Sequence, residues 1–254
     1  MHCVYVHRNK EGSPVDDGMK RPCAVVFDVG TVLVDWNPAY LYDRLIADPE
    51  ERAWFLTHVV TLSWHSEQDR GRSCAEGVSA LCERFPGYEP LIGAFYERWL
   101  ETIAGPIEGS VALMRELKAA GVPVYGLTNF SAELWPQSVA AYPFLGEFDA
   151  VAVSGEIGDI KPARRIFDVL VERSGRPPAE LVYNDDREDN LATAHALGMR
   201  CLLFETPEKL RHDLAELGFP VAAGDAAAPA AGTASKGVSS SRVFAAPAAS
   251  VSGL

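Results

Sequence analysis

Polar residues stand where apolar runs of the sequence end, in a combination that could transfer a phosphoryl group. These residues are Asp28, Thr128, Asn129, Asp185 and Asp186, with Lys161 at the expected start of a helix. Taken singly, such residues more often close a turn or cap a helix. The carboxyl ends of parallel strands, however, lie at one edge of a sheet, so these residues would converge there whatever their separation in sequence.

The combined set has a coherent chemistry. A carboxylate can take up a phosphoryl group only when its own negative charge and that of the substrate are offset. Several carboxylates can hold a hard cation for this purpose, while a lysine, a hydroxyl and backbone N–H groups bind the transferring oxygens. The carboxylates would come from Asp28, Asp185 and Asp186, and the donors from Lys161, Thr128 and the backbone of Asn129. The expected partner is therefore a small phosphorylated molecule.

Five short apolar runs, separated by helical patterns, would position these residues. The runs lie at 23–27, 122–127, 149–154, 181–183 and 200–204. Such alternation predicts a parallel, doubly wound α/β sheet. Residues 37–105 break the alternation, because their apolar residues recur at three- and four-residue spacings and predict a compact helical insertion after the first strand.

The composition argues against several classes of partner. The 254 residues carry a formal net charge of −12 and contain no run of Lys and Arg, so neither nucleic acid nor a membrane surface is expected to bind. The five cysteines show no Cys-x-x-Cys spacing, which predicts neither a disulfide framework nor a zinc site and favours a reducing cytoplasm. No apolar run is long enough to span a membrane, and residues 1–20 lack an apolar leader. We expect a cytoplasmic monomer or weak homodimer.

Four segments, in this order, resemble the motifs of the haloacid dehalogenase-like (HAD) hydrolase superfamily. They are FDVGTVLVD at 27–35, LTN at 127–129, Lys161-Pro162, and NDDREDN at 184–190. The resemblance covers residues 22–220. Within the superfamily, the first motif, the helical segment after it and the paired acids most resemble bacterial glucose-1-phosphate phosphatase-like members with a helical cap.

The expected fold class is therefore α/β, a three-layer Rossmann-like doubly wound parallel sheet with a small all-α cap inserted after the first strand. The core would comprise residues 21–36 and 106–220, and the cap residues 37–105. Residues 1–20 would form an N-terminal extension. The Ala- and Ser-rich residues 221–254 lack the large apolar side chains that offset ordering entropy, so we expect a disordered tail.

The resemblance also implies a role for each polar residue. Asp28 would be the nucleophile that becomes an aspartyl-phosphate, and Lys161 would orient it and balance charge. The implied cofactor is Mg²⁺, held by Asp28, the backbone carbonyl of Gly30 and Asp186, with Asp185 beside it in the metal site. The phosphoryl oxygens would be bound by Thr128, Asn129 and Lys161.

Gly30 is a departure from the superfamily pattern. Typical phosphatases of the superfamily carry a second Asp two residues after the nucleophile, where it acts as general acid and base. A backbone metal contact survives at Gly30, but protonation of the leaving group and activation of water lose their usual agent. General acid–base catalysis is typically worth about 10²–10⁴-fold. A reactive leaving group, another residue or solvent must then serve, unless the chemistry differs.

Two other functions remain open at this point. A metal-independent 2-haloacid dehalogenase of the same superfamily would need no proton for its halide, but such enzymes carry Tyr-Gly-Thr after the nucleophile and an Arg at the substrate. This chain has Val-Gly-Thr at 29–31, and neither Arg44 nor Arg52 can be aligned with that Arg. A catalytically silent regulatory domain is the second alternative. The retained Asp28, Lys161 and Asp186 argue against it.

Within the helical insertion, Trp64-His65 and Asp69-Arg70-Gly71 are the residues expected nearest the substrate. We take His65 as a candidate substrate-binding residue. A buried, packed histidine is the alternative for such a residue on an otherwise apolar helix.

Overall fold

The computed structural model of the chain describes residues 22–222. The N-terminal extension expected at 1–20 lies outside the described residues, as does the tail expected at 221–254 apart from its first two residues. Both expectations stay predictions.

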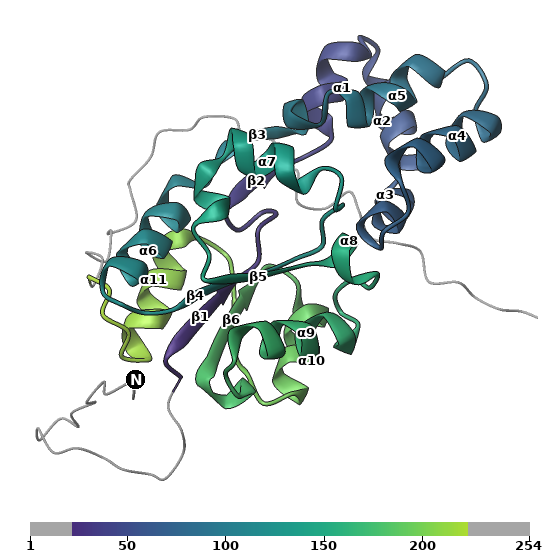
Figure 1. Cartoon of the computed structure of the whole chain (residues 1–254). Coiled ribbons are helices and arrows are strands. Elements are labelled where there is room, and N and C mark those ends of the chain that lie inside the picture. The colour runs from purple at the N-terminus through teal and green to yellow at the C-terminus, as the bar shows by residue number, and fades with distance from the viewer. Residues whose placement is uncertain (1–21, 223–254) are drawn as a thin grey trace, which may run out of the picture. The chain divides into compact units, whose positions relative to one another are not determined.

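A five-stranded parallel sheet forms the centre of the described chain (Figure 1). Its strands, in spatial order, are β5 (Ala150–Val153), β4 (Val124–Thr128), β1 (Ala24–Phe27), β6 (Leu181–Asp185) and β7 (Arg200–Leu203). Each neighbouring pair is parallel. The expected doubly wound sheet is confirmed, and each of the five predicted apolar runs coincides with one of these strands.

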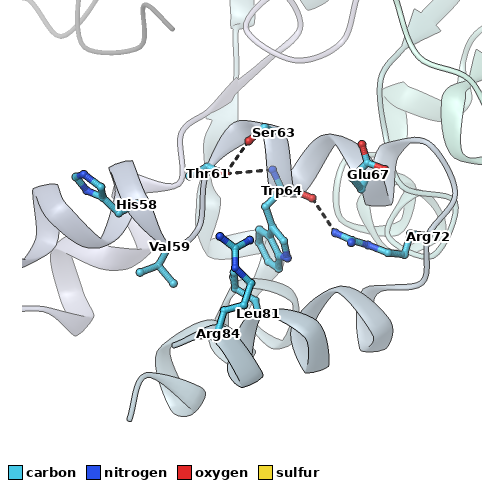
Figure 2. Close-up of a pocket in the computed structure, with 9 residues that line it drawn as sticks. All are labelled: His58, Val59, Thr61, Ser63, Trp64, Glu67, Arg72, Leu81 and Arg84. Carbon is cyan, nitrogen blue, oxygen red and sulfur yellow. Dashed lines mark hydrogen bonds between the residues drawn. The ribbon is translucent and has the colours of Figure 1, made fainter. Parts of the chain in front are cut away.

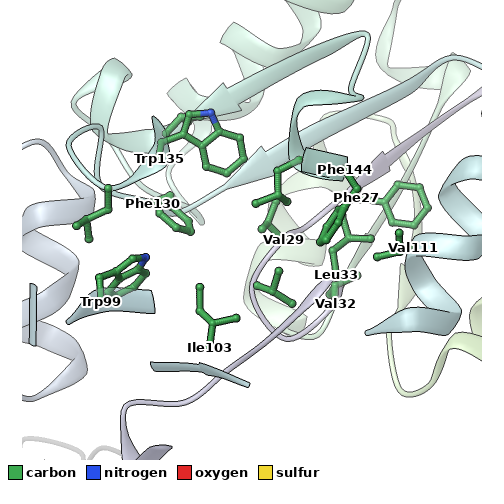
Figure 3. Close-up of a cluster of buried hydrophobic side chains, with 14 of the residues drawn as sticks. Phe27, Val29, Val32, Leu33, Trp99, Ile103, Val111, Phe130, Trp135 and Phe144 are labelled. Atoms are coloured by element: carbon green, nitrogen blue, oxygen red, sulfur yellow. The ribbon is translucent and has the colours of Figure 1, made fainter. Parts of the chain in front are cut away.

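Strand β1 is buried on both faces, and its side chains alternate between two hydrophobic cores. Val25 and Phe27 lie in one core, and Ala24 and Val26 lie in the other. The helices that cover the two faces are α6 (Glu108–Ala119) and α11 (Pro207–Glu216) on the first, and α9 (Arg164–Ser174) and α10 (Glu188–Ala196) on the second (Figure 1). Figure 3 shows part of the first core around Phe27. Full burial of a Val or Phe side chain stabilises the fold by about 1.5–3 kcal/mol, so the packing of β1 fixes the position of the residue that follows it.

The strand order reverses at β1. The chain goes from β1 to β4 on one side and later returns to β6 on the other. The carboxyl ends of β1, β4 and β6 therefore border one crevice, which is where ligands bind in sheets of this type. Asp28 directly follows β1, and Asp185 is the last residue of β6.

The segment after β1 is helical, as expected. Its elements are α1 (Ala39–Leu45), α2 (Pro49–His58), α3 (Leu62–Asp69), α4 (Cys74–Arg84), α5 (Glu89–Glu97) and the short 3₁₀ helix η1 (Trp99–Thr102). Side-chain caps separate neighbouring helices: Thr61 accepts a hydrogen bond from the Trp64 N–H at the start of α3, and Ser73 forms a reciprocal capping box with Glu76 at the start of α4.

A two-stranded antiparallel ribbon, not predicted from the sequence, joins the two ends of this insertion. Strand β2 (Val34–Trp36) pairs with β3 (Ile103–Pro106), the latter in a stretch whose Gly and Pro indicate a break. The chain thus leaves the core and returns to it side by side. The division into separate cap and core domains stays a prediction.

The expectation that Lys161 stands at the start of a helix is wrong. Helix α9 begins at Arg164, and the Ala163 N–H donates to the carbonyl of Ile160, which closes a turn around Lys161 and Pro162 before the helix starts. The remaining elements are α7 (Trp135–Ala141), η2 (Pro143–Gly146), α8 (Ser154–Ile157) and η3 (Pro178–Glu180). Within 22–222, each helix is too short or too polar to cross a membrane.

Candidate active site

Three carboxylates meet at the crevice beside β1. One oxygen from each of Asp28, Asp185 and Asp186 lies within 4.8 Å of the others. Asp28 and Asp185 are buried, whereas Asp186 is exposed, so the cluster opens to solvent on the Asp186 side. The structure brings these acids together as the sequence indicated, and the role of each stays a proposal.

Lys161 binds two of the three acids. Its Nζ lies 2.7 Å from Asp28 Oδ1 and 2.8 Å from Asp185 Oδ2, and it donates to the carbonyl of Leu127 at 3.1 Å. Burial alone would lower the pKa of Lys161, but the charges of Asp28 and Asp185 raise it above its ordinary value. Lys161 therefore stays a cation in spite of its burial.

Asp28 is the least readily ionised of the acids. Burial raises its pKa to about 8, the charges of Asp185 and Asp186 add to the rise, and Lys161 opposes it. One lysine does not offset three clustered carboxylates, so a further positive charge would let Asp28 ionise near neutral pH. An ionised Asp28 is the form that can act as a nucleophile.

Asp185 is held by donors on several sides. It accepts hydrogen bonds from the Tyr183 hydroxyl, from Asn190 Nδ2 at 3.0 Å and from the backbone N–H of Arg187 at 2.8 Å. Burial would raise the pKa of Asp185, but Lys161, Tyr183 and Asn190 outweigh it and lower the pKa. Sequence reasoning missed Tyr183 as a support, although its position two residues before Asp185 on one strand places both on the same face.

The donor set suits a hard cation. Three clustered carboxylates offer the oxygen ligands that Mg²⁺ prefers, and a cation among them would oppose the rise that burial and the neighbouring acids cause in the pKa of Asp28. Both oxygens of Asp185 are engaged by protein donors, so Asp28 and Asp186 are the freer ligands. The Gly30 carbonyl accepts the Thr31 hydroxyl at 2.6 Å in the tight turn after β1, where Thr31 has a φ of 60°.

Asn129 fixes the position of Lys161. Its Nδ2 donates to the Lys161 carbonyl at 3.1 Å, and its Oδ1 accepts from the Lys161 N–H at 2.7 Å. This reciprocal pair ties the end of β4 to the turn before α9. Because the side chain of Asn129 is used in this way, we expect its backbone N–H to serve the phosphoryl group, beside the buried hydroxyl of Thr128.

His65 lies in a packed aromatic cluster. It is 6% exposed, its ring stacks on Trp36 at a centroid distance of 5.5 Å, and its Nδ1 lies 3.1 Å from the Tyr96 hydroxyl. The neighbouring Trp99 packs edge-on against Phe130, the residue after Asn129 (Figure 3). The cluster thus borders the loop that follows β4, and contact between His65 and a substrate stays a prediction.

Asp69 and Arg70 bind the core. The Asp69 carbonyl accepts the Ser154 hydroxyl at 2.6 Å, and Arg70 forms an ion pair with Asp159 at 3.1 Å. The expectation that this segment lies over the site is consistent with these contacts, which sequence spacing alone could not specify.

A separate cavity of about 370 Å³ lies within the helical insertion (Figure 2). Its lining comes from α2, α3, α4 and the intervening turns: His58, Val59, Thr61, Ser63, Trp64, Glu67, Arg72, Leu81 and Arg84. This lining includes neither the clustered acids nor Lys161, so we place the chemistry at the acids rather than in this cavity.

Comparison with known proteins gives a consistent result. A family model described as haloacid dehalogenase-like hydrolase matches residues 24–198, which include the acids, Lys161 and the insertion. A sesquiterpene phosphatase of Aspergillus oryzae is 27% identical over 180 residues, covering 69% of this chain and 86% of that protein. Acyl-CoA dehydrogenase family member 10 of Mus musculus is 37% identical over 217 residues, covering 78% of this chain but 19% of the mouse protein.

A solved structure is also similar. A HAD family enzyme from Bacteroides thetaiotaomicron, in a magnesium complex, superposes with a TM-score of 0.60 at 21% identity, covering 77% of this chain and 99% of that one. At this identity, the likeness shows a shared fold.

Proposed function

This chain belongs to the haloacid dehalogenase-like hydrolase family, and we propose that it is an Mg²⁺-dependent phosphatase that hydrolyses a small phosphomonoester through an aspartyl-phosphate. The observation that carries the proposal is the cluster of Asp28, Asp185 and Asp186 around Lys161 at the crevice beside β1. The phosphatases among its relatives support it.

Each side chain has a task in the proposed reaction. Asp28 attacks the phosphorus atom, and Lys161 holds Asp28 in place and binds a phosphoryl oxygen. The Thr128 hydroxyl and the Asn129 N–H bind the other phosphoryl oxygens as charge builds on them. Mg²⁺, when bound by Asp28, the Gly30 carbonyl and Asp186, supplies the positive charge that the acids and the phosphoryl group require. Asp185 keeps Lys161 and the nucleophile aligned.

The structure disfavours the dehalogenase alternative. That reaction would need an arginine at the substrate, and the two arginines considered for it are paired elsewhere: Arg44 with Glu101 at 2.8 Å and Arg52 with Asp43 at 2.8 Å. The silent regulatory domain is disfavoured because the nucleophile, the lysine and the acids keep a complete set of contacts.

A panel of phosphomonoesters, including sugar phosphates and aryl phosphates, tests the proposal. Phosphate release should require Mg²⁺, stop on addition of EDTA and disappear in Asp28→Asn. A parallel assay should detect no halide release from 2-haloacids. Phosphate release that persists in EDTA, or halide release, would contradict the assignment.

A further inference from the structure

Gly30 leaves the proposed phosphatase without the side chain that usually protonates the leaving group. Asp35, the next acid along the chain, is exposed, and its two carboxylate oxygens each lie 2.9 Å from the Tyr40 hydroxyl. Asp69, on the last turn of α3, is 7% exposed instead. We propose that Asp69 is the general acid and base of the reaction, an inference that rests on the proposed function.

Hydrogen bonds place Asp69 against the phosphoryl-binding end of β4. Ser154 Oγ donates to the Asp69 carbonyl at 2.6 Å and accepts from the Phe130 N–H at 2.8 Å. Phe130 is the residue after Asn129, whose side chain holds Lys161. A single hydroxyl therefore links the helical insertion to the loop from which we expect the transferring oxygens to be bound.

Close backbone approach reinforces this placement. A Cβ atom on Gly71 would lie 3.3 Å from the Gly155 carbonyl oxygen, and one on Gly155 would lie 2.3 Å from the Ala132 N. Gly71 lets the turn after α3 approach α8 more closely than a larger residue would allow, and Gly155 does the same for α8 and the loop after β4. The end of α3 thus lies against α8, which packs on the loop after β4, and Asp69 is the buried carboxylic acid on the last turn of α3.

The Asp69 carboxyl is not saturated by protein donors. Its Oδ1 has no hydrogen-bond partner among the described residues, and His65 Nε2 lies 3.6 Å from it. Burying a charged carboxylate oxygen without a hydrogen bond costs free energy. The protonated form of Asp69, which can donate a proton to a leaving group, is therefore favoured. Asp185 differs in this respect, because hydrogen bonds to both of its oxygens stabilise it as an anion.

The charges around Asp69 agree with this function. Burial raises its pKa, while His65, the Ser131 N–H and Lys161 pull the pKa down. The influence of Lys161 matters, because Lys161 also contacts Asp28, and Asp69 is therefore within electrostatic reach of the reaction centre. Cys74 of α4 and Tyr96 of α5 also face Asp69, and burial raises the pKa of both, so they remain neutral.

The proposed reaction has two steps, and Asp69 transfers a proton in each. As the Asp28 carboxylate forms its bond to phosphorus, the bond from phosphorus to the leaving oxygen breaks, and that oxygen takes the Asp69 proton. A water molecule then gives a proton to the Asp69 carboxylate and attacks the aspartyl-phosphate. The bond between phosphorus and Asp28 breaks, releasing inorganic phosphate and restoring both acids.

The test is the dependence of rate on the leaving group. Full-length native protein and Asp69→Asn are compared on para-nitrophenyl, phenyl and alkyl phosphates with saturating Mg²⁺. Asp69→Asn should lower kcat/KM by about 10²-fold or more for alkyl phosphates and by less than about 3-fold for the para-nitrophenyl ester, which leaves without a proton. Asp35→Asn, the same change at an exposed acid, is the matched control and should alter neither rate.

Two further variants test the placement of Asp69 and the need for an acid. Ser154→Ala loosens the link that holds Asp69 at the loop after β4 without removing the acid, so it should lower kcat/KM in the same order of esters as Asp69→Asn, but by a smaller factor. In Gly30→Asp combined with Asp69→Asn, an acid returns at the position two residues after the nucleophile. A Cβ at Gly30 would meet no atom of the described residues within 4 Å apart from its chain neighbours, so the backbone admits a side chain there, and we expect activity on alkyl phosphates to recover.

The possible failures are distinguishable. If native protein releases no phosphate from any ester, the proposed function itself fails. If native protein is active but Asp69→Asn loses activity equally on all three esters, Asp69 has a structural role and only this inference fails. If Asp69→Asn does not fold, the leaving-group series of the native protein tests the inference by itself. A steep fall in rate with increasing basicity of the leaving group would overturn the inference, and a shallow dependence would support it.

Discussion

Replacing Asp28, the proposed nucleophile, should stabilise the metal-free protein at alkaline pH. The pKa of Asp28 rises from 3.8 to about 8 on folding, so the folded protein holds a proton there that the unfolded chain has already lost. A group with a raised pKa contributes stability that is present below pH 3.8 and is lost as the pH rises toward 8. In Asp28→Asn this loss cannot occur, because an amide does not titrate.

The magnitude follows from the size of the shift. Each pH unit between the two pKa values lowers the free energy of unfolding by up to about 1.4 kcal/mol, so one independent group would contribute a fall of about 4 kcal/mol between pH 5 and pH 8. Asp185 titrates together with Asp28, so about 4 kcal/mol is an upper bound.

Urea denaturation in EDTA at several pH values between about 5 and 8 measures the effect. The free energy of unfolding should fall more steeply with pH in the native protein than in Asp28→Asn, and the variant should be the more stable of the two near pH 8. Saturating Mg²⁺ should reduce the difference by stabilising the native protein. Equal slopes for the two proteins, or a variant less stable near pH 8, would refute the reasoning.

Three other changes have expected outcomes. Lys161→Met leaves Asp28 and Asp185 without their shared cation, so it should destabilise the fold by about 3–5 kcal/mol by urea denaturation and abolish phosphate release; near-native stability would contradict the buried pairing. Asp186→Asn removes the exposed ligand and should raise the Mg²⁺ concentration for half-maximal activity by about 10-fold or more, whereas Asp189→Asn nearby should not. Deletion of 223–254 should change neither turnover nor thermal midpoint, because its composition cannot support a packed core.

The sequence predicted those features that depend on local pattern. The strand carrying Asp28 is a continuous apolar run, and the parallel sheet follows from the alternation of such runs with helices. Parallel strands end at the same edge of their sheet, so the convergence of Asp28 with Asp185 could be expected from this alternation alone.

Contacts between segments far apart in the chain could not be predicted from the local sequence pattern. The reciprocal contact of Asn129 with Lys161 and the link from Ser154 to Asp69 each join residues far apart in the chain. The sequence around Pro162 resembles a helix start because Pro favours the first helical position. In the structure, the Ala163 N–H instead donates to the Ile160 carbonyl in a turn that precedes the helix.

The β2–β3 ribbon makes the helical insertion exchangeable. Paired strands lie about 5 Å apart, a gap that a two-residue turn can close, so the two ends of the insertion present the core with the geometry of an ordinary hairpin. Helices of another size or shape could be built between Trp36 and Ile103 without altering the register of the parallel sheet. A different helical insertion could therefore be joined to the same core without moving Asp28 from the end of β1.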